Sequence, residues 1–184
     1  MPFLNTNIPD LLIFEPTIYG DERGYFYESY NEQTFAKVGI TARFVQDNQA
    51  ASTKNVLRGL HYQVGEWAQA KLVRCVQGAV YDVAVDIRPN SPTYGQWEGI
   101  LLTAENHRQF FVPHGFAHGY AVLSETAIFA YKCDNFYSKE HEGGLFYQDE
   151  NLNIDWQIDL NQAIVSEKDL VQPLFGKHKP FYVS

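Results

Sequence analysis

The sequence predicts an all-β domain, either a closed antiparallel barrel or a sandwich. Short β-prone segments alternate with clusters of Gly, Pro, Ser and Asn, and long helical patterns are few. Aromatic residues make up 15% of the chain, and aromatic and β-branched side chains favour strands. Many short strands with few helices are the pattern of barrels and sandwiches.

The expected strands fill the middle of the chain, and short helices flank them. Segment 79–88 contains the run Val-Tyr-Asp-Val-Ala-Val-Asp-Ile, which is strongly β-prone. Residues 31–37 are the clearest helix candidate, with Asn31 as the N-cap and Gly39 as the stop. Ser166 is placed to cap a short turn of helix near the C-terminus. A loop at 19–24 should lead into a strand at 25–30, and the remaining expected strands are 70–76, 97–103, 108–113, 118–122 and 126–135.

Length and charge narrow the class of protein. We expect one domain over residues 1–184, because a chain of 184 residues can bury its own core and no linker, low-complexity tract or repeat divides it. The formal net charge of −8 argues against a broad nucleic-acid-binding face. A few convergent basic side chains could still hold a small anion.

The same sequence predicts a cytoplasmic protein. Cys75 and Cys133 form no ligand-spaced cluster, and two isolated cysteines fit a reducing compartment. The N-terminal residues 1–6 show neither a basic nor an apolar signal-peptide region, so no signal peptide is expected. No apolar run approaches the length of a membrane span, so no membrane association is expected.

Polar side chains interrupt apolar strand sequence at Arg58, His61 and Lys71. Such polarity in a barrel wall is costly unless it lines a wet, functional cavity. His61 can accept a proton near neutral pH, although a lone histidine is more often a half-buried structural residue. A regular strand would place Arg58 and His61 on opposite faces. We therefore expect a bend or bulge at Gly59 that brings both into one cavity.

A metal site is the main alternative for this region. A cupin-type metal site uses two histidines at H-x-H, an acidic residue soon after and a histidine on a later strand. Here Gln63 occupies the second histidine position, and Glu66 is the only nearby acid. With His118 as the later histidine, the ligands remain too few for zinc or iron. The sequence therefore predicts no metal.

Two further groups of residues have both a structural and a functional interpretation. Pro113 and Gly115 predict a tight turn before His118, which could be a core histidine or a ligand contact. Tyr131 and Tyr137 could simply pack in an aromatic-rich barrel. A phenol is also a suitable proton donor when it faces a base across a carbon, which is what inversion of that carbon requires.

Several collinear motifs cover most of the chain, from about Phe14 to Leu170; they are Tyr27-Glu28-Ser29, 45–48 (Val-Gln-Asp-Asn), 57–63 (Leu-Arg-Gly-Leu-His-Tyr-Gln), 71–74 (Lys-Leu-Val-Arg), 111–119 (Phe-Val-Pro-His-Gly-Phe-Ala-His-Gly) and Tyr131-Lys132-Cys133. Together they resemble the dTDP-4-dehydrorhamnose 3,5-epimerases of the rhamnose pathway. The resemblance implies a cupin-type double-stranded β-helix (jelly-roll) barrel with a few short helices, a homodimer, and no metal or other cofactor. The loop at 65–70 departs from the Pro-rich version expected before Lys71, and no family motif follows Leu170.

The resemblance also implies roles for individual residues. His61 would be the general base, Asp169 its carboxylate partner, Tyr131 the proton donor on the opposite sugar face, and Lys71 the ammonium beside the C4 oxygen. Tyr137 would stack on the thymine. Positions that match nucleotide or sugar contacts are Arg23, Glu28, Gln46, Asn48, Arg58, His118, Glu142 and Lys168. Asp82 is our own candidate for orienting the His118 imidazole, or else an ordinary polar strand residue.

The implied substrate is a dTDP-linked 4-keto-6-deoxy sugar. Its protons at C3 and C5 flank the ketone, so removing either leaves an enolate whose charge lies on the C4 oxygen. Three alternatives share this frame: inversion at only one of the two carbons, a keto-isomerase, and a carbohydrate-binding barrel without chemistry. The last would not need His61, Lys71, Tyr131 and Asp169 together.

Overall fold

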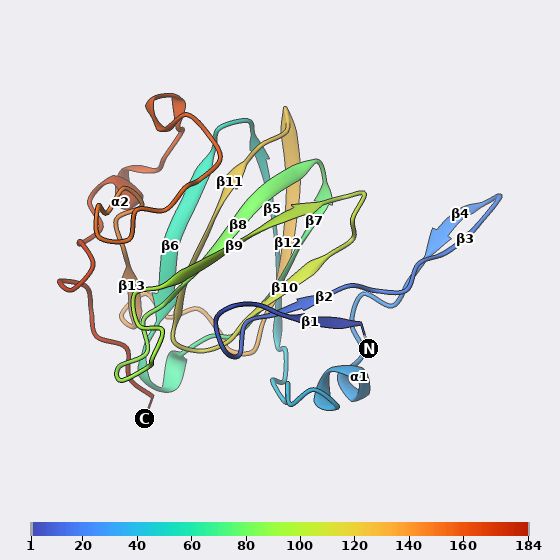
Figure 1. Ribbon diagram of the computed structural model, residues 1–184, viewed down its shortest axis with the longest axis horizontal. Helices are drawn as coiled ribbons and strands as arrows, with labels where there is room; N and C mark the ends of the chain where they lie inside the picture. The colour runs from blue at the N-terminus through green and yellow to red at the C-terminus, as the bar shows by residue number, and fades with distance from the viewer. Residues whose placement is uncertain (1, 184) are drawn as a thin grey trace.

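The computed structural model describes residues 2–183, and two antiparallel sheets form the walls of its barrel (Figure 1). One sheet has the strand order β1 (Phe3–Asn5), β2 (Leu12–Phe14), β10 (Gln109–Val112), β7 (Lys71–Gln77), β12 (Thr126–Cys133) and β5 (Gln46–Thr53). The other has the order β13 (Glu142–Gly144), β6 (Leu57–Gln63), β11 (Phe116–Val122), β8 (Ala79–Asp86) and β9 (Trp97–Thr103). The predicted all-β architecture is confirmed.

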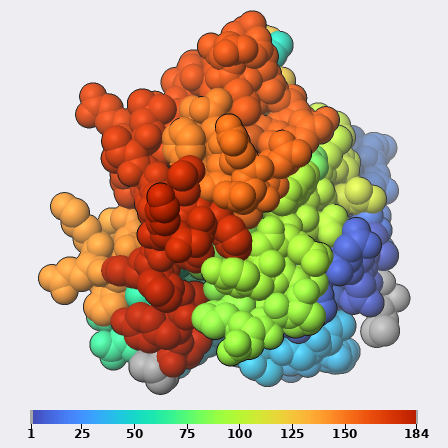
Figure 2. Space-filling model, turned by 60° about the vertical axis from the view of Figure 1, so that its left-hand side comes forward, coloured from blue at the N-terminus to red at the C-terminus, as the bar shows by residue number. Residues whose placement is uncertain are grey.

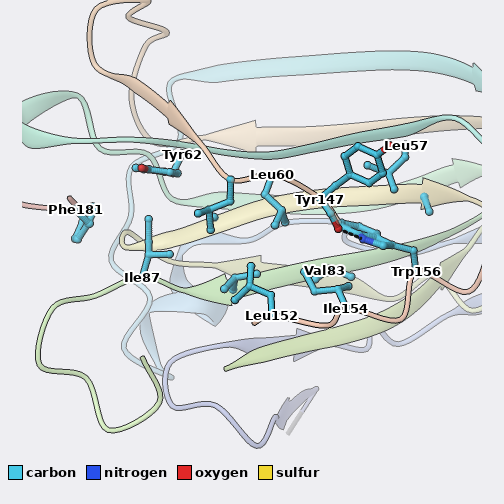
Figure 3. Packing of buried hydrophobic residues seen from close by; sticks show 14 of the residues in the cluster. Leu57, Leu60, Tyr62, Val83, Ile87, Tyr147, Leu152, Ile154, Trp156 and Phe181 are labelled. Carbon is cyan, nitrogen blue, oxygen red and sulfur yellow. Dashed lines mark hydrogen bonds between the residues drawn. The ribbon is translucent and has the colours of Figure 1, made fainter. Parts of the chain in front are cut away.

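The barrel core continues into the C-terminal part of the chain. Leu57 and Leu60 of β6 and Val83 of β8 pack against Ile154 and Trp156, which lie beyond the last strand (Figure 3). All of these strand side chains are fully buried. The C-terminal part of the chain, coloured orange to red, covers much of the face shown in Figure 2. This packing holds residues 152–156 against the barrel, and backbone hydrogen bonds of Ile164 to Asn55 and Leu57 hold the chain shortly before Asp169.

The short helices begin where the sequence places their caps. Helix α1 (Glu32–Ala36) follows Asn31, whose side chain accepts a hydrogen bond from the Thr34 amide. Helix α2 (Glu167–Leu170) follows Ser166, which caps the Asp169 amide in the same way. Two 3₁₀ turns complete the helical elements, η1 (Gly65–Trp67) and η2 (Leu160–Gln162). Among the described residues, no helix is long and apolar enough to cross a membrane.

The prediction for residues 19–30 was wrong in extent, because the expected loop at 19–24 contains a strand and the expected strand is shorter. The expected strand at 25–30 is only β4 (Gly24–Phe26), which pairs with β3 (Tyr19–Asp21) in a two-stranded hairpin. The hairpin projects away from the barrel (Figure 1), and its aromatic side chains are solvent-exposed, with Tyr25 63% and Phe26 68% accessible. The exposed aromatic residues of this segment gave it a strand-like sequence pattern, although it does not join the barrel sheets.

The predicted irregularity at Gly59 is present. His61 lies opposite His118, and Arg58 lies opposite Tyr120, so β6 holds one more residue than β11 over this interval. Gly59 has φ +125°, and a Cβ there would lie 2.6 Å from the Gly119 Cα. The bulge therefore needs glycine, and it turns the Arg58 and His61 side chains into one cavity.

Candidate active site

A cavity of about 430 Å³ lies between the two sheets of the barrel. A second cavity, of about 380 Å³, adjoins it, and His61, Lys71 and Tyr131 line both. Of the other predicted site residues, Arg58, His118, Lys168 and Asp169 line the first cavity, and Gln46, Asn48, Tyr137 and Glu142 line the second. The structure thus gathers residues that are more than a hundred positions apart in the sequence.

His61 and Asp169 form a close pair on the wall of the first cavity. The His61 Nε2 lies 2.5 Å from the Asp169 Oδ1, and the Gly59 amide donates to the other carboxylate oxygen at 3.3 Å. Burial raises the pKa of Asp169, but its hydrogen bonds to His61, Gly59 and Ser166 outweigh burial, so the pKa lies below its usual value. The carboxylate stays ionised at neutral pH and can stabilise a protonated His61.

Lys71 begins β7 and places its ammonium near the junction of the two cavities. Its Nζ lies 5.9 Å from the centre of the Tyr131 ring. Burial lowers the pKa of Lys71, and the nearby Cys133, Asp82 and Glu142 offset only part of that effect. In its charged form, a buried ammonium of this kind interacts more strongly with a developing negative charge than a cation in water does.

Tyr131 comes from the opposite sheet to His61. It lies on β12, whereas His61 lies on β6, so the phenol and the imidazole line the cavity from different walls. Burial raises the pKa of Tyr131 to about 12; Cys133 and Tyr120 add to this shift, and Arg58 opposes it. The phenol therefore keeps its proton at neutral pH and can act as a proton donor.

His118 and Asp82 form a second histidine–carboxylate pair. The His118 Nε2 lies 2.9 and 3.0 Å from the two Asp82 oxygens, and both residues are buried. Burial raises the pKa of Asp82, while His118 and Lys71 oppose that shift. The contact we expected between Asp82 and the His118 imidazole is present, and it fixes the ring that faces His61 across the β6–β11 pair.

A chain of polar contacts lines the second cavity. The Tyr137 hydroxyl donates to Glu142 at 3.0 Å, and the Lys168 Nζ donates to the other Glu142 oxygen at 2.5 Å. Gln46 donates to Asn48 at 3.1 Å along the inner face of β5. These groups offer hydrogen-bond donors, acceptors and an aromatic face at one site.

Comparisons with known proteins agree with this arrangement. The family model described as dTDP-4-dehydrorhamnose 3,5-epimerase matches residues 5–177. The chain belongs to this family. The dTDP-4-dehydrorhamnose 3,5-epimerase of Shigella flexneri is 55% identical over 92% of this chain and 93% of its own length. The family's cupin-type jelly roll is the fold we predicted, and it is confirmed.

Solved structures of epimerases superpose closely. The epimerase of Legionella pneumophila, solved in complex with dTDP-4-keto-L-rhamnose, gives a TM-score of 0.93 at 50% identity and covers 99% of this chain and 98% of its own. ChmJ of Streptomyces bikiniensis, a 3'-monoepimerase solved with dTDP-quinovose, gives a TM-score of 0.87 at 31% identity, with 93% and 86% covered.

Two predicted contact residues lie outside both cavities of this epimerase-family chain. Arg23 sits on the β3–β4 hairpin and pairs with Asp21, and Glu28 accepts a hydrogen bond from Asn31. A single chain therefore does not bring Arg23 or Glu28 to His61.

Sequence reasoning also missed two residues near Arg58. The Ser52 hydroxyl accepts from both Nε and Nη2 of Arg58 at 3.2 Å, and Tyr120 lines the first cavity. Alternation along the strand was the available signal, because Tyr120 follows His118 by two positions and so shares its face. Over residues 2–183, no group of three or more His, Cys, Asp or Glu side chains is arranged to hold a metal.

Proposed function

We propose that this protein converts dTDP-4-dehydro-6-deoxy-D-glucose to dTDP-4-dehydro-L-rhamnose by inverting C3 and C5. The observation that carries the proposal is the His61–Asp169 pair, which shares one cavity with Lys71 and Tyr131. Family membership and the keto sugar bound to the Legionella pneumophila relative support the same reaction.

His61 is the proposed base, and Asp169 is its partner. An imidazole that removes a proton from C3 or C5 becomes positively charged, and the ionised Asp169 stabilises that charge at 2.5 Å. The Gly59 amide and the Ser166 cap hold the carboxylate in place, so His61 keeps one orientation. General-base catalysis of this kind contributes about 10²- to 10⁴-fold.

Lys71 is the proposed partner of the C4 oxygen. Removing a proton beside the ketone moves charge onto that oxygen, and an ammonium near the site lowers the energy of the enolate more than that of the neutral ketone. One such group contributes about 2.7–4 kcal/mol to the transition state.

Tyr131 is the proposed acid. It faces His61 from the other sheet and retains its proton, so it can deliver that proton to the face opposite the one from which His61 removed it. Abstraction from one face and delivery to the other inverts the carbon. Once His61 has released its proton to solvent and Tyr131 has regained one from solvent, the same sequence at the second carbon completes the reaction.

The nucleotide is proposed to occupy the region around the second cavity. Tyr137 supplies an aromatic surface for thymine, Gln46, Asn48 and Glu142 supply polar contacts, and Arg58 and Lys168 supply positive charge for the diphosphate. His118 would contact the sugar beside His61. Binding the nucleotide, which does not react, positions the sugar at the reacting residues.

The decisive experiment is incubation with dTDP-4-dehydro-6-deoxy-D-glucose in heavy water. The wild-type protein should place deuterium at C3 and C5 of an L-configured product, and His61→Ala should place it at neither. Stereochemical analysis by NMR and a deuterium count by mass spectrometry measure both. Wild-type exchange rates in His61→Ala would remove His61 as the base.

Inversion at a single carbon is the second candidate, because ChmJ, a 3'-monoepimerase, has a closely similar fold. ChmJ has the same fold, but its identity of 31% is well below the 55% identity of the Shigella flexneri epimerase. The same deuterium count separates the two reactions, because a single-centre enzyme places one deuterium where a 3,5-epimerase places two.

We also propose that the protein is a homodimer in which the hairpin of one subunit reaches the cavity of the other. The hairpin extends from the barrel, exposes Tyr19, Tyr25 and Phe26, and carries Arg23 away from its own cavities (Figure 1). Exposed aromatic clusters are typical of protein interfaces. Docking on a second subunit would bury them and bring Arg23 to a nucleotide.

The proposed setting is the cytoplasm, where the product would serve dTDP-rhamnose and cell-surface polysaccharide synthesis. Cys75 and Cys133 are both free and buried, which fits a reducing compartment. The proposed chemistry uses side chains alone and requires no metal or other cofactor.

A further inference from the structure

Tyr120 is a buried phenol in the wall of the first cavity, and the proposed mechanism assigns it no task. It lies two residues after His118 on β11, so both side chains share the face of the strand that borders the cavity. Tyr120 is 4% exposed, and its ring stacks on Phe129 with the ring centres 4.1 Å apart.

Within residues 2–183, the Tyr120 hydroxyl has no hydrogen-bond partner. Burial raises the pKa of Tyr120, and Arg58 and Ser52 offset only part of that shift, so the phenol is neutral and keeps its proton. Ser52 is a polar neighbour of this phenol, and its oxygen already accepts two N–H groups of Arg58.

Two residues close to Tyr120 offer its hydroxyl no acceptor. Phe129 is apolar, and Arg58, directly opposite Tyr120 on β6, can only donate hydrogen bonds. Buried hydroxyl groups in folded proteins are paired as a rule, and an unpaired one in the wall of a binding cavity indicates a partner on the ligand.

We propose that the Tyr120 hydroxyl donates a hydrogen bond to an oxygen of the hexose, which makes Tyr120 a further substrate-contacting residue of the site. This inference rests on the proposed function. The strand register supports the hexose as the partner: His118 faces His61, and the next pair along the same two strands is Tyr120 facing Arg58. The phenol therefore lies beside the proposed position of the reacting sugar ring.

The test is Tyr120→Phe, which keeps the ring and removes only the hydroxyl. Calorimetry would measure the binding of dTDP, which lacks the hexose, and of dTDP-glucose, which has a hexose but no ketone and cannot react. We expect unchanged affinity for dTDP and about tenfold weaker affinity for dTDP-glucose, the size of one hydrogen bond. The Tm of the ligand-free variant should equal or exceed that of the wild type, because no bond within the protein is lost.

Tyr62→Phe is the matched control for stability. The buried Tyr62 hydroxyl donates to the Lys179 carbonyl, so its removal should lower the Tm, in contrast to Tyr120→Phe.

Three results would overturn the inference. The first is unchanged affinity of Tyr120→Phe for dTDP-glucose, and the second is a lowered Tm without ligand. The third is equal weakening for dTDP and dTDP-glucose, which would place the contact on the diphosphate. Failure of the wild type to exchange deuterium at C3 and C5 would instead refute the proposed reaction, and the binding comparison would still decide the role of Tyr120.

Discussion

Lys71 shows how one side chain can be prepared for chemistry by its position alone. It begins a strand at the junction of two cavities, where burial disfavours its charged form and the enolate of a keto sugar would supply a compensating negative charge. Tyr131, nearby on the next strand, is affected in the opposite way, since burial there favours the protonated, neutral form. Desolvation thus makes the Lys71 ammonium easier to deprotonate and the Tyr131 phenol harder to deprotonate.

These opposite shifts predict the alkaline limb of the pH profile. The pKa of Lys71 lies below its ordinary value of 10.5, so its charge is present at lower pH and is lost as the pH rises through that lowered pKa. Tyr131, with a pKa of about 12, still holds its proton in that range. We expect kcat to fall with rising pH before pH 10.5 is reached, as measured by product formation between neutral pH and that value.

Lys71→Ala is the control for this assignment. Its residual activity should be low and should lack the alkaline decline. An unchanged midpoint in Lys71→Ala would assign the decline to another group.

At the scale of elements, the bulge in β6 decides which side chains meet. Without the extra residue, the strand would turn Arg58 away from the face that carries His61. The bulge also presents the Gly59 amide to Asp169, so this one irregularity positions both His61 and Asp169. The need for glycine at position 59 can be tested directly by substitution.

Gly59→Ala should destabilise the protein and abolish activity. The new Cβ would lie 2.6 Å from Gly119 Cα and 2.8 Å from the His118 carbonyl, and the left-handed φ adds strain. We expect a loss of about 3 kcal/mol or more in the free energy of unfolding, measured by urea denaturation.

Gly39→Ala is the matched control for Gly59→Ala. Gly39 also has a positive φ, of +86°, but has open space around its Cα. Its replacement should cost about 1 kcal/mol, the conformational part alone. Equal losses at the two positions would show that the close contact with β11 is unimportant.

The strands and caps could be predicted from the sequence because their signals are local. Turn residues bounded β7, β8, β9 and β12 within one or two residues, and Asn31 and Ser166 cap helices as expected. The pairing of His61 with Asp169 spans 108 positions, and no local pattern contains it; family resemblance alone indicated it. The unpaired hydroxyl of Tyr120 depends on the three-dimensional neighbours of one atom, so it could be recognised only in the structure.

At the scale of the whole molecule, the projecting hairpin separates Arg23 from the cavities of the barrel. Arg23 lies on it, while the residues that Arg23 is expected to assist lie in the barrel. A dimer with exchanged hairpins would form each site from two subunits, and this arrangement has a distinctive experimental signature.

Mixing two inactive variants should restore activity. If Arg23 acts on the other subunit, a hybrid dimer of Arg23→Ala and His61→Ala contains one site with both residues intact. After subunit exchange of an equal mixture, about a quarter of all sites would be complete. The measurement is epimerase activity before and after exchange, with light scattering to confirm the dimer mass. No recovery after proven exchange would mean that Arg23 does not act across subunits.

The position of Asp169 on α2, after every strand of the barrel, has a consequence for protein synthesis. The ribosome produces the strand bearing His61 long before it produces the helix bearing the carboxylate. A product of premature termination that ends before this helix retains the sequence of every barrel strand. It lacks the Asp169 carboxylate that contacts His61. If Asp169 supports the base as proposed, a chain that stops before this helix should fold its barrel strands without gaining epimerase activity.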